Sequence, residues 1–345
     1  MYNTVIIGAG QAGLSAGYYL KKLHKNFLII DKSQDVGQIW QERYDSLVLF
    51  TSKQYSSLPG LKIDGEPNSL PTKDEVASYL KLYAKTFELP IQLDTEVFSI
   101  HKEGDYFSIS TKKNTYTSKN IIIATGPFHK PSIPSFAAKL HPDVLQLHSS
   151  EYKNPFQLRE GNVLVVGGGN SGAQIAVEVS RDRNTYLSTG QKLKFIPLHI
   201  GNRSIFWWID KLGILTASSS SLIGKRIQKL GDPIFGKELK NSIRENKIKM
   251  VGRAYDATEN TVLVEDSGKL EIQNVIWATG FKPDYDLLGT IPGIFNQNGY
   301  PLHNRGVSNI GGLFFLGLPW QYRRGSALLQ GVGYDARYLV NYLQE

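Results

Sequence analysis

The chain has 345 residues, of which 41% are hydrophobic and none is cysteine. This length suits about two domains with cores of their own, and the lack of cysteine excludes disulfides, thiolate metal sites and thiol-based catalysis. The net charge of +8 comes from lysines and arginines scattered along the chain, which favours a basic surface that attracts anionic cofactors and gives no indication of nucleic-acid binding.

The usual signals for membrane insertion and secretion are not found. No window reaches the roughly 18 unbroken apolar residues of a transmembrane helix. The first apolar run is short, and it lacks a cationic lead and a cleavage site of small residues. We therefore expect a cytoplasmic protein without a transmembrane segment.

The amino-terminal segment predicts a dinucleotide-binding turn. Residues 4–7 indicate a buried strand, a GxGxxG pattern follows, and residues 14–20 indicate a helix. The first glycine allows a tight turn, the second lets the backbone approach a pyrophosphate, and the third lets helix and strand pack closely. A second strand, 27–30, ends at Asp31, where a ribose hydroxyl needs an acceptor. The predicted site comprises Gly8, Gly10, Gln11, Ala12, Gly13, Asp31 and Lys32.

The segment that follows is predicted to be irregular up to Pro59. A helix is expected from about Pro71, because acidic residues oppose the helix dipole in its first turn and apolar residues recur at helical spacing as far as Tyr83. Three strands are predicted, over residues 92–100, 106–111 and 119–124. The last one leads into the turn Ala124-Thr125-Gly126, which is assigned to the first site.

The same design recurs in the second half of the chain. Residues 162–166 indicate a strand, residues 167–172 repeat the GxGxxG pattern, and residues 275–280 repeat the apolar strand that ends in Ala-Thr-Gly. A matched pair in the same order predicts an α/β protein with two Rossmann-like dinucleotide-binding domains. The second site is predicted from Gly167, Gly169, Asn170, Ser171, Gly172, Ser188, Thr189, Ala278, Thr279 and Gly280.

We place the domain boundaries by these repeats. Residues 1–157 form the first part of the first domain, residues 158–283 form the second domain, and residues 284–345 return to complete the first. The stretch 203–241 is an insertion rich in Trp, Ile, Leu and Lys. A lid or packing element is favoured for it, with an amphipathic helix at a membrane surface as the alternative.

Two dinucleotide sites in one chain indicate an electron relay, in which one cofactor stays bound and the other visits. FAD suits the permanent role because it accepts a hydride and can pass electrons on singly or in pairs. The second site would then bind NADPH or NADH. The loop after the predicted strand 185–187 contains no acid that would repel a 2′-phosphate and no arginine that would demand one, so we expect both nucleotides to be used within about a hundredfold of one another.

The chain resembles the flavin-containing monooxygenases, and more closely the short bacterial flavoproteins of that superfamily. The resemblance covers nearly the whole chain, and the motifs that carry it are GAGQAG, Gly37-Gln38-Ile39-Trp40, GGGNSG, Ala278-Thr279-Gly280-Phe281, Gly317-Leu318-Pro319-Trp320 and residues 324–329. It implies a glutathione-reductase-like architecture. It also implies that NAD(P)H reduces FAD, which captures O₂ as a C4a-hydroperoxide and oxygenates a thioether or amine.

The resemblance also implies roles for single residues. Gln38 and Trp40 would contact the flavin, the backbone of Val97 would contact adenine, and Gln330 would join the cofactor site. Three candidates for the flavin face are Phe50, Trp320 and Gln321. The expected partners are a small-molecule substrate and O₂, and a homodimer is left open.

Two departures from the family pattern bear on the chemistry. In the fingerprint FxGxxxHxxx(Y/F), His148 and Tyr152 fit, whereas Pro142 and Val144 replace its Phe and Gly, and Tyr152 in place of Trp argues against the Baeyer–Villiger branch. Phe50 replaces an Asn near the flavin, which suggests a short-lived oxygenated flavin. An NAD(P)H:acceptor reductase or oxidase and a flavin-binding redox sensor or efflux accessory protein remain alternatives.

Overall fold

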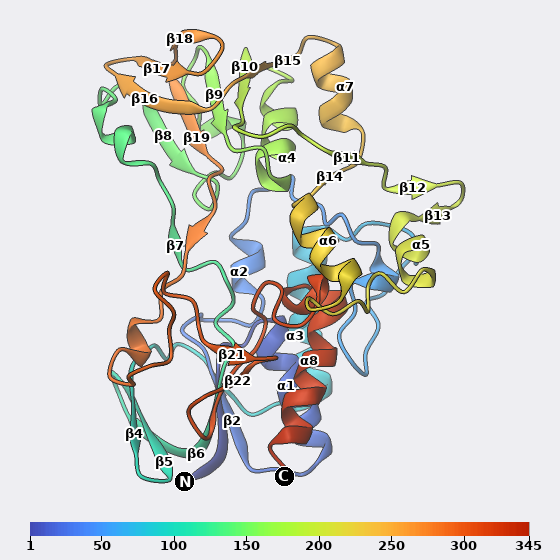
Figure 1. Ribbon diagram of the computed structural model, residues 1–345, viewed down its shortest axis with the longest axis vertical. Coiled ribbons are helices and arrows are strands. Elements are labelled where there is room, and N and C mark those ends of the chain that lie inside the picture. The colour runs from blue at the N-terminus through green and yellow to red at the C-terminus, as the bar shows by residue number, and fades with distance from the viewer. Residues whose placement is uncertain (345) are drawn as a thin grey trace.

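The computed structural model describes residues 1–344 and contains two units whose central strands are parallel (Figure 1). The lower unit in this view holds both ends of the chain, and the upper unit is formed by the middle of the sequence. Each unit begins with a β–turn–α element that carries one of the two glycine patterns. The predicted α/β fold with two Rossmann-like units is confirmed.

The first unit has the central strand order β23-β6-β1-β2-β3, with every neighbouring pair parallel. These strands are β1 (Tyr2–Ile7), β2 (Phe27–Ile30), β3 (Ile91–Gln92), β6 (Thr115–Ile123) and β23 (Leu313–Phe315). Side chains alternate between the two faces of a strand, so Ile6 packs into a core beneath the helices, whereas Val5 and Ile7 pack into a second core on the opposite face. Burial on both faces explains the unbroken apolar runs of the sequence.

Helices cover one face of this sheet and further strands cover the other. The helices are α1 (Gln11–Lys22), α3 (Lys73–Thr86) and α8 (Leu329–Tyr342). The opposite face carries β4 (Val97–Glu103) and β5 (Tyr106–Thr111), and the short strands β21 (His303–Asn304) and β22 (Val307–Ser308) extend the β23 edge. The helix predicted from Pro71 is α3, which starts with a capping box between Thr72 and Glu75.

The second unit repeats the parallel design with the order β15-β10-β9-β19-β8. Its strands are β8 (Leu145–His148), β9 (Val163–Val166), β10 (Thr185–Ser188), β15 (Ile248–Val251) and β19 (Asn274–Trp277). The helices α4 (Asn170–Val179) and α7 (Glu238–Arg244) pack on each other and on this sheet. An antiparallel sheet of β16 (Ala254–Thr258), β17 (Thr261–Val264) and β18 (Gly268–Glu271) contributes to its other core.

The chain crosses between the units twice, and the two crossings pair with each other. β7 (Lys130–Pro131) lies antiparallel to β20 (Phe281–Lys282). The boundary predicted at residue 157 is therefore placed too late, because β8 already belongs to the second sheet, where it pairs with β19. The return crossing at β20 lies next to the boundary predicted at residue 283.

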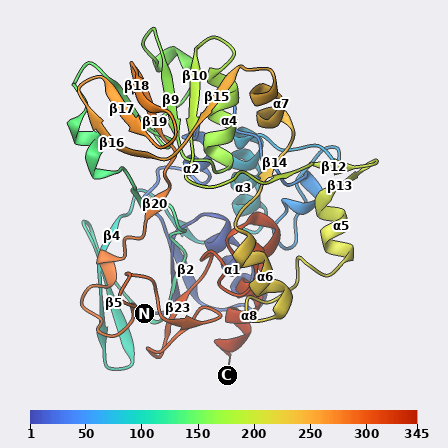
Figure 2. The ribbon, with the colours of Figure 1, turned by 45° about the horizontal axis from the view of Figure 1, so that its top comes forward.

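The predicted insertion forms a separate arm beside both units (Figure 2). The arm spans residues 195–235 and contains β11 (Phe195–Ile196), β12 (His199–Ile200), β13 (Arg203–Ser204), α5 (Ile205–Lys211), α6 (Leu222–Leu230) and β14 (Ile234–Phe235). It thus begins before the predicted stretch 203–241, whose last residues belong to α7 of the second unit. The arm packs inward through an apolar cluster of Phe206 and Phe235 with Phe50 and Tyr55 of the first unit. None of the helices in residues 1–344 is long and apolar enough to cross a bilayer.

Candidate cofactor-binding site

The turn between β1 and α1 has a different environment at each of its three glycines. Gly8 has φ +111°, and a Cβ there would lie 2.5 Å from the carbonyl oxygen of Ala124. A Cβ at Gly13 would collide with the carbonyl oxygen of Gly8, whereas a Cβ at Gly10 would meet nothing within 4 Å. The outer glycines are thus required by packing, and the middle one leaves backbone open for a ligand.

The turn between β9 and α4 repeats these environments. Gly167 has φ +118° and faces the carbonyl of Ala278, Gly172 faces the carbonyl of Gly167, and Gly169 has nothing within 4 Å of its Cβ position. Neither α1 nor α4 has a side-chain cap, so the first N–H groups of both helices are left for another acceptor. The same three-part arrangement therefore occurs in both units.

The predicted Ala-Thr-Gly turns lie directly beside the two glycine turns. The amide of Ala124 donates to Ile7, and that of Ala278 donates to Val166, each at 2.8 Å. Gly126 (φ +75°) and Gly280 (φ +80°) adopt left-handed backbone with open space at their Cβ positions. Both units thus present two open glycines at the carboxyl edge of the sheet, where nucleotides bind in folds of this class.

The two threonines of these turns bond to the first crossing. The Thr125 hydroxyl lies 3.1 Å from Nε2 of His129, and the Thr279 hydroxyl donates to the carbonyl of Ser132 at 2.5 Å. His129 and Ser132 flank β7, so the first crossing is fixed to the ends of both strands that precede the open glycines.

Asp31 holds the first turn in shape. Its carboxylate accepts the amide of Ala9 at 2.5 Å and the amide of Ser33 at 2.7 Å. A carboxylate has about four acceptor positions, so it retains capacity for a ribose hydroxyl, the role predicted for it. Lys32 beside it is exposed, and Val97 begins β4 opposite Thr111.

Three side chains predicted to face the flavin are engaged elsewhere. The Gln38 side chain accepts from the Gln34 amide and donates to Glu42 on the exposed side of its own helix, α2 (Gln38–Gln41). Phe50 stacks on Phe235 of the arm with 4.6 Å between ring centroids. The contacts of Gln38 and Phe50 with the flavin stay predictions, and Gln321 is the third such side chain.

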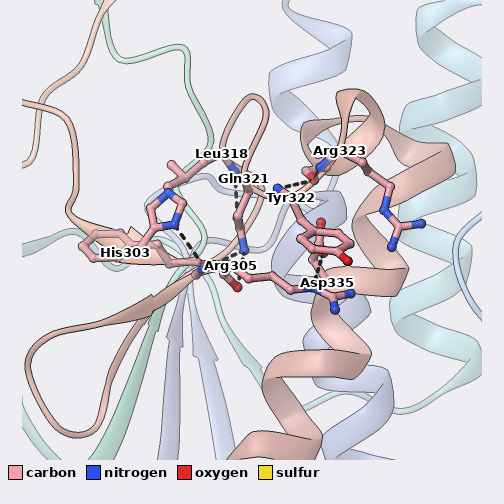
Figure 3. Close-up of polar contacts among 10 residues, drawn as sticks. His303, Arg305, Leu318, Gln321, Tyr322, Arg323 and Asp335 are labelled. Carbon is pink, nitrogen blue, oxygen red and sulfur yellow. Dashed lines mark hydrogen bonds and ion pairs between the residues drawn. The ribbon is translucent and has the colours of Figure 1, made fainter. Parts of the chain in front are cut away.

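Gln321 is 4% exposed, and its amide bonds only to backbone (Figure 3). Its Nε2 donates to the carbonyl of Phe315 at 3.0 Å, and its Oε1 accepts the amide of Leu318 at 3.2 Å. The Gln321 side chain therefore closes its own loop, and its place beside the flavin stays a prediction. Trp320 before it is half-buried with φ +56°, and Trp40 is half-buried against the first core.

A buried ion pair fixes the loop that leads into α8. Asp335 has no exposed surface, and one of its carboxylate oxygens accepts from Nε of Arg305 at 3.2 Å. The Arg305 guanidinium lies between the rings of Tyr322 and Tyr338, 3.9 and 4.1 Å from their centroids (Figure 3). Arg305 therefore ties the loop before α8, through Tyr322, to the body of the helix, through Asp335 and Tyr338.

Several polar atoms around this helix start have no protein partner. The Oε1 atom of Gln330 and the Nε atom of Arg323 are buried and unpaired within residues 1–344, as is the Oγ atom of Ser52 elsewhere in the first unit. Gln11 at the start of α1 reaches the same region by donating to the carbonyl of Ala327 at 3.3 Å. Buried polar groups without partners are costly, so this surrounding suits a polar ligand between α1 and α8.

In the second site, the backbone remains open while three predicted side chains have structural roles. Asn170 donates to the carbonyl of Pro233 and accepts the amide of Phe235, both at 3.2 Å, and so holds the arm to α4. Ser188 is buried and bridges the carbonyl of Gly252 and the amide of Ala254. Ser171 is exposed, and the Thr189 hydroxyl closes a turn to Gln191.

Arg253 is a residue of this site that sequence reasoning missed. It follows β15, and its Nε atom lies 2.6 Å from the position that a Cβ would occupy at Gly190. Arg253 is exposed and forms no ion pair with any residue in 1–344. The pairing of β15 with β10 brings this cation to the loop where a nucleotide ribose is read, although 63 residues of sequence separate Gly190 from it.

His148 supports the open glycine of the second unit. The ring is fully buried, Nδ1 accepts the amide of Ser150 at 3.2 Å, and Nε2 donates to the carbonyl of Gly280 at 3.0 Å. Burial lowers the pKa of His148, while the Gly280 carbonyl and Glu151 oppose that shift. His148 is thus a neutral positioning residue and has no contact that would make it a catalytic base.

We expect acid to destabilise the protein partly through His148. The unfolded histidine binds a proton below its ordinary pKa of about 6.5, whereas the folded one does so only at a lower pH. The contribution of His148 to the free energy of unfolding is therefore complete above about pH 6.5. It declines as the pH falls below that value, by at most about 1.4 kcal/mol per pH unit, until the folded histidine is protonated as well. Urea unfolding at a series of pH values should give a flatter decline for His148→Gln.

The control for this experiment is His101→Gln, because His101 is exposed on β4. That variant should keep the pH dependence of the parent. Equal slopes for the parent and His148→Gln would show that the buried ring does not contribute to acid sensitivity.

Residues 5–193 match the model of the pyridine nucleotide-disulphide oxidoreductase family. An uncharacterized oxidoreductase of Bacillus subtilis, CzcO, is 57% identical over 340 residues, which cover 99% of this chain and 98% of that protein. A probable indole-3-pyruvate monooxygenase of Arabidopsis thaliana is 27% identical over 86% of this chain and 77% of its own length. A solved flavin-containing monooxygenase from Stenotrophomonas maltophilia has a TM-score of 0.84 with 25% identity, covering 99% of this chain and 98% of its own.

Proposed function

Because the chain belongs to the pyridine nucleotide-disulphide oxidoreductase family, we propose that it uses FAD and NADPH to oxygenate a soft nucleophile such as a thioether or an amine. The enzyme class is the flavin-dependent oxidoreductases, as in the flavin-containing monooxygenase with the same fold. The oxygenation itself is the proposal. The observation that carries it is the pair of matching glycine turns in one chain, together with similarity to two proteins named as monooxygenases.

The residues of the first unit fit FAD. The open backbone at Gly10 and Gly126 would receive the pyrophosphate, and the carboxylate of Asp31 would accept from the ribose. The unpaired polar atoms of Gln330 and Ser52 would find partners on the polar rim of the flavin. When bound, FAD supplies two-electron chemistry between a nicotinamide and O₂.

The second unit fits a nicotinamide dinucleotide. Gly169 and Gly280 leave the corresponding backbone open, and His148 fixes the carbonyl of Gly280. Arg253 would pair with a 2′-phosphate, which NADPH has and NADH lacks. This favours NADPH more than the sequence alone suggests.

The arm would exclude water from the region between the units. Phe206 and Phe235 stack with Phe50 of the first unit, and Asn170 fastens the same segment to α4. Excluding water from such a site limits the side reaction in which oxygen is released as hydrogen peroxide before it reaches the substrate. The family name also refers to disulphides, but a chain without cysteine cannot carry the dithiol part of that chemistry.

A second candidate is an NAD(P)H oxidase or acceptor reductase that does not oxygenate. The observation that favours it is the loss of part of the family fingerprint, since Val144 is buried in an apolar core instead of being a glycine. Both candidates share the cofactors and differ in their products.

Product analysis distinguishes the two. The FAD-loaded protein is given NADPH, O₂ and a panel of aryl and alkyl methyl sulfides, and sulfoxide, peroxide and consumed NADPH are measured together. We expect sulfoxide to account for a substantial share of the NADPH with at least one sulfide. If peroxide alone balances the NADPH for every sulfide and amine tried, oxygenation is contradicted and the oxidase reading holds.

A further inference from the structure

Helix α6 has one side tied to the protein and another side that is apolar and exposed. Leu222 is 88% exposed, and Ile223 and Leu230 are each 52% exposed. Leu212, in the loop before the helix, is 69% exposed. We call these four residues, together with the basic residues of α6, the α6 surface.

The opposite side of α6 is held by specific contacts. Gly224 has no room for a side chain because its Cβ position lies against the carbonyl of Ser218. The amide of Ser219 donates to Tyr322 at 2.6 Å, and Asp232 after the helix pairs with Arg324 at 3.1 Å. These contacts join the arm to the loop before α8 and fix which residues of α6 point outward.

The α6 surface is also strongly basic. Residues 199–231 contain five lysines and arginines and one aspartate, a net charge of +4 out of +8 for the whole chain. Lys225, Arg226 and Lys229 lie on α6 itself, and none of them forms an ion pair with a residue in 1–344. About a tenth of the chain therefore carries half of its excess positive charge, next to its most exposed leucines.

We propose that the α6 surface docks on an anionic lipid bilayer. The leucines and isoleucine would enter the boundary between headgroups and acyl chains, and the three cations would meet lipid phosphates. Their aliphatic stems allow the charged ends to reach the headgroups while the helix lies in the interface. This inference does not depend on which reaction the cofactors serve.

Charge argues against a second copy of the chain as the occupant. A two-fold interface centred on α6 would place Lys225, Arg226 and Lys229 opposite the same cations of the partner. No carboxylate lies on α6 to balance them. A bilayer with phosphatidylglycerol offers both an apolar layer and the opposite charge.

The test is co-sedimentation of the FAD-loaded protein with vesicles of phosphatidylcholine, with and without phosphatidylglycerol, at equal total lipid. We expect binding to the anionic vesicles that weakens as salt is added. Replacing Lys225, Arg226 and Lys229 together by Gln should lower the partition coefficient by roughly a hundredfold. Leu222→Gln with Ile223→Gln and Leu230→Gln should lower it by more than about tenfold.

Matched control variants remove exposed lysines or an exposed leucine from surfaces other than the α6 surface. Replacing Lys22, Lys25 and Lys112, all exposed, by Gln lowers the net charge equally and should change binding less than about threefold. Leu82→Gln removes a leucine that is 53% exposed on α3. Flavin content and circular dichroism report whether each variant is folded.

Three results would overturn the proposal. One is equal binding to neutral and anionic vesicles, and another is equal losses in the α6 and control variants. The third is no vesicle binding by the parent, with a dimer in light scattering that the leucine and isoleucine changes dissociate, which would assign the surface to a second copy.

Discussion

A Gly169→Ala protein should fold and keep its flavin, yet lose most of its response to NADPH. The backbone at Gly169 (φ −79°) suits alanine, and a Cβ there meets no protein atom within 4 Å. The change should therefore cost at most about 1 kcal/mol in the free energy of unfolding, as for an N-cap alanine. The methyl group would fill the space beside the first N–H groups of α4, and we expect kcat/KM for NADPH to fall by about a hundredfold, or 2.7 kcal/mol.

The first unit supplies the reciprocal experiment. Gly10 has the same open surroundings, so Gly10→Ala should fold but release its flavin on dialysis. Gly172→Ala is the matched control for stability, since its Cβ would collide with the carbonyl of Gly167. That variant should unfold at markedly lower urea. If kcat/KM for NADPH is unchanged in Gly169→Ala, the glycine turn between β9 and α4 does not bind the nicotinamide nucleotide.

Arg253→Gln should shift the choice of reductant from NADPH toward NADH. A hydrogen bond to a charged group contributes about 1.5–3 kcal/mol, so losing the pairing with the 2′-phosphate should lower kcat/KM for NADPH by roughly 10- to 100-fold. The value for NADH should change by less than about threefold, because NADH carries no group for this arginine. Steady-state kinetics with both nucleotides measure the two values.

Binding of the oxidised nucleotides gives a readout that does not need turnover. The dissociation constant of NADP⁺ should rise with Arg253→Gln, and that of NAD⁺ should stay the same. Lys249→Gln removes an equal charge from β15, where Lys249 lies over the ring of Tyr186 instead of the Gly190 loop. Equal losses in both variants would mean that general electrostatic attraction, and not Arg253 itself, holds the phosphate.

The sequence predicts the parts of the fold that depend on local pattern. A buried strand, a glycine turn and a helix lie within about 20 residues, so both β–turn–α elements can be recognised without knowledge of their neighbours. The predicted boundary at residue 157 puts β8 in the first domain, because only the pairing of β8 with β19, about 130 residues further on, makes it part of the second sheet. The capping box of α3 likewise carries its own signal, whereas the β7–β20 pair does not.

In the candidate site as well, features that depend on local sequence can be predicted and features that depend on distant contacts cannot. The glycines can be predicted because a left-handed backbone or a close approach of two chain segments requires this residue type. The side chains that face a cofactor have no such local signal. Gln321 and Asn170 are polar residues beside a site, yet both bond to nearby backbone, and no sequence pattern reveals that use. Arg253 acts across the sheet, so its place depends on strand order and not on spacing along the chain.

The paired crossings have a mechanical consequence. β7 and β20 contain two residues each, and the two ends of β7 are held by the contacts of His129 with Thr125 and of Ser132 with Thr279. A ribbon this short resists bending apart but can twist, so it forms a torsional hinge between the units. The units also contact each other away from the ribbon, because Gln174 bonds to the hydroxyl of Tyr44 at 3.1 Å and to the carbonyl of Val48 at 2.9 Å. Any rotation of one unit against the other must therefore turn about the ribbon and break the contacts of Gln174.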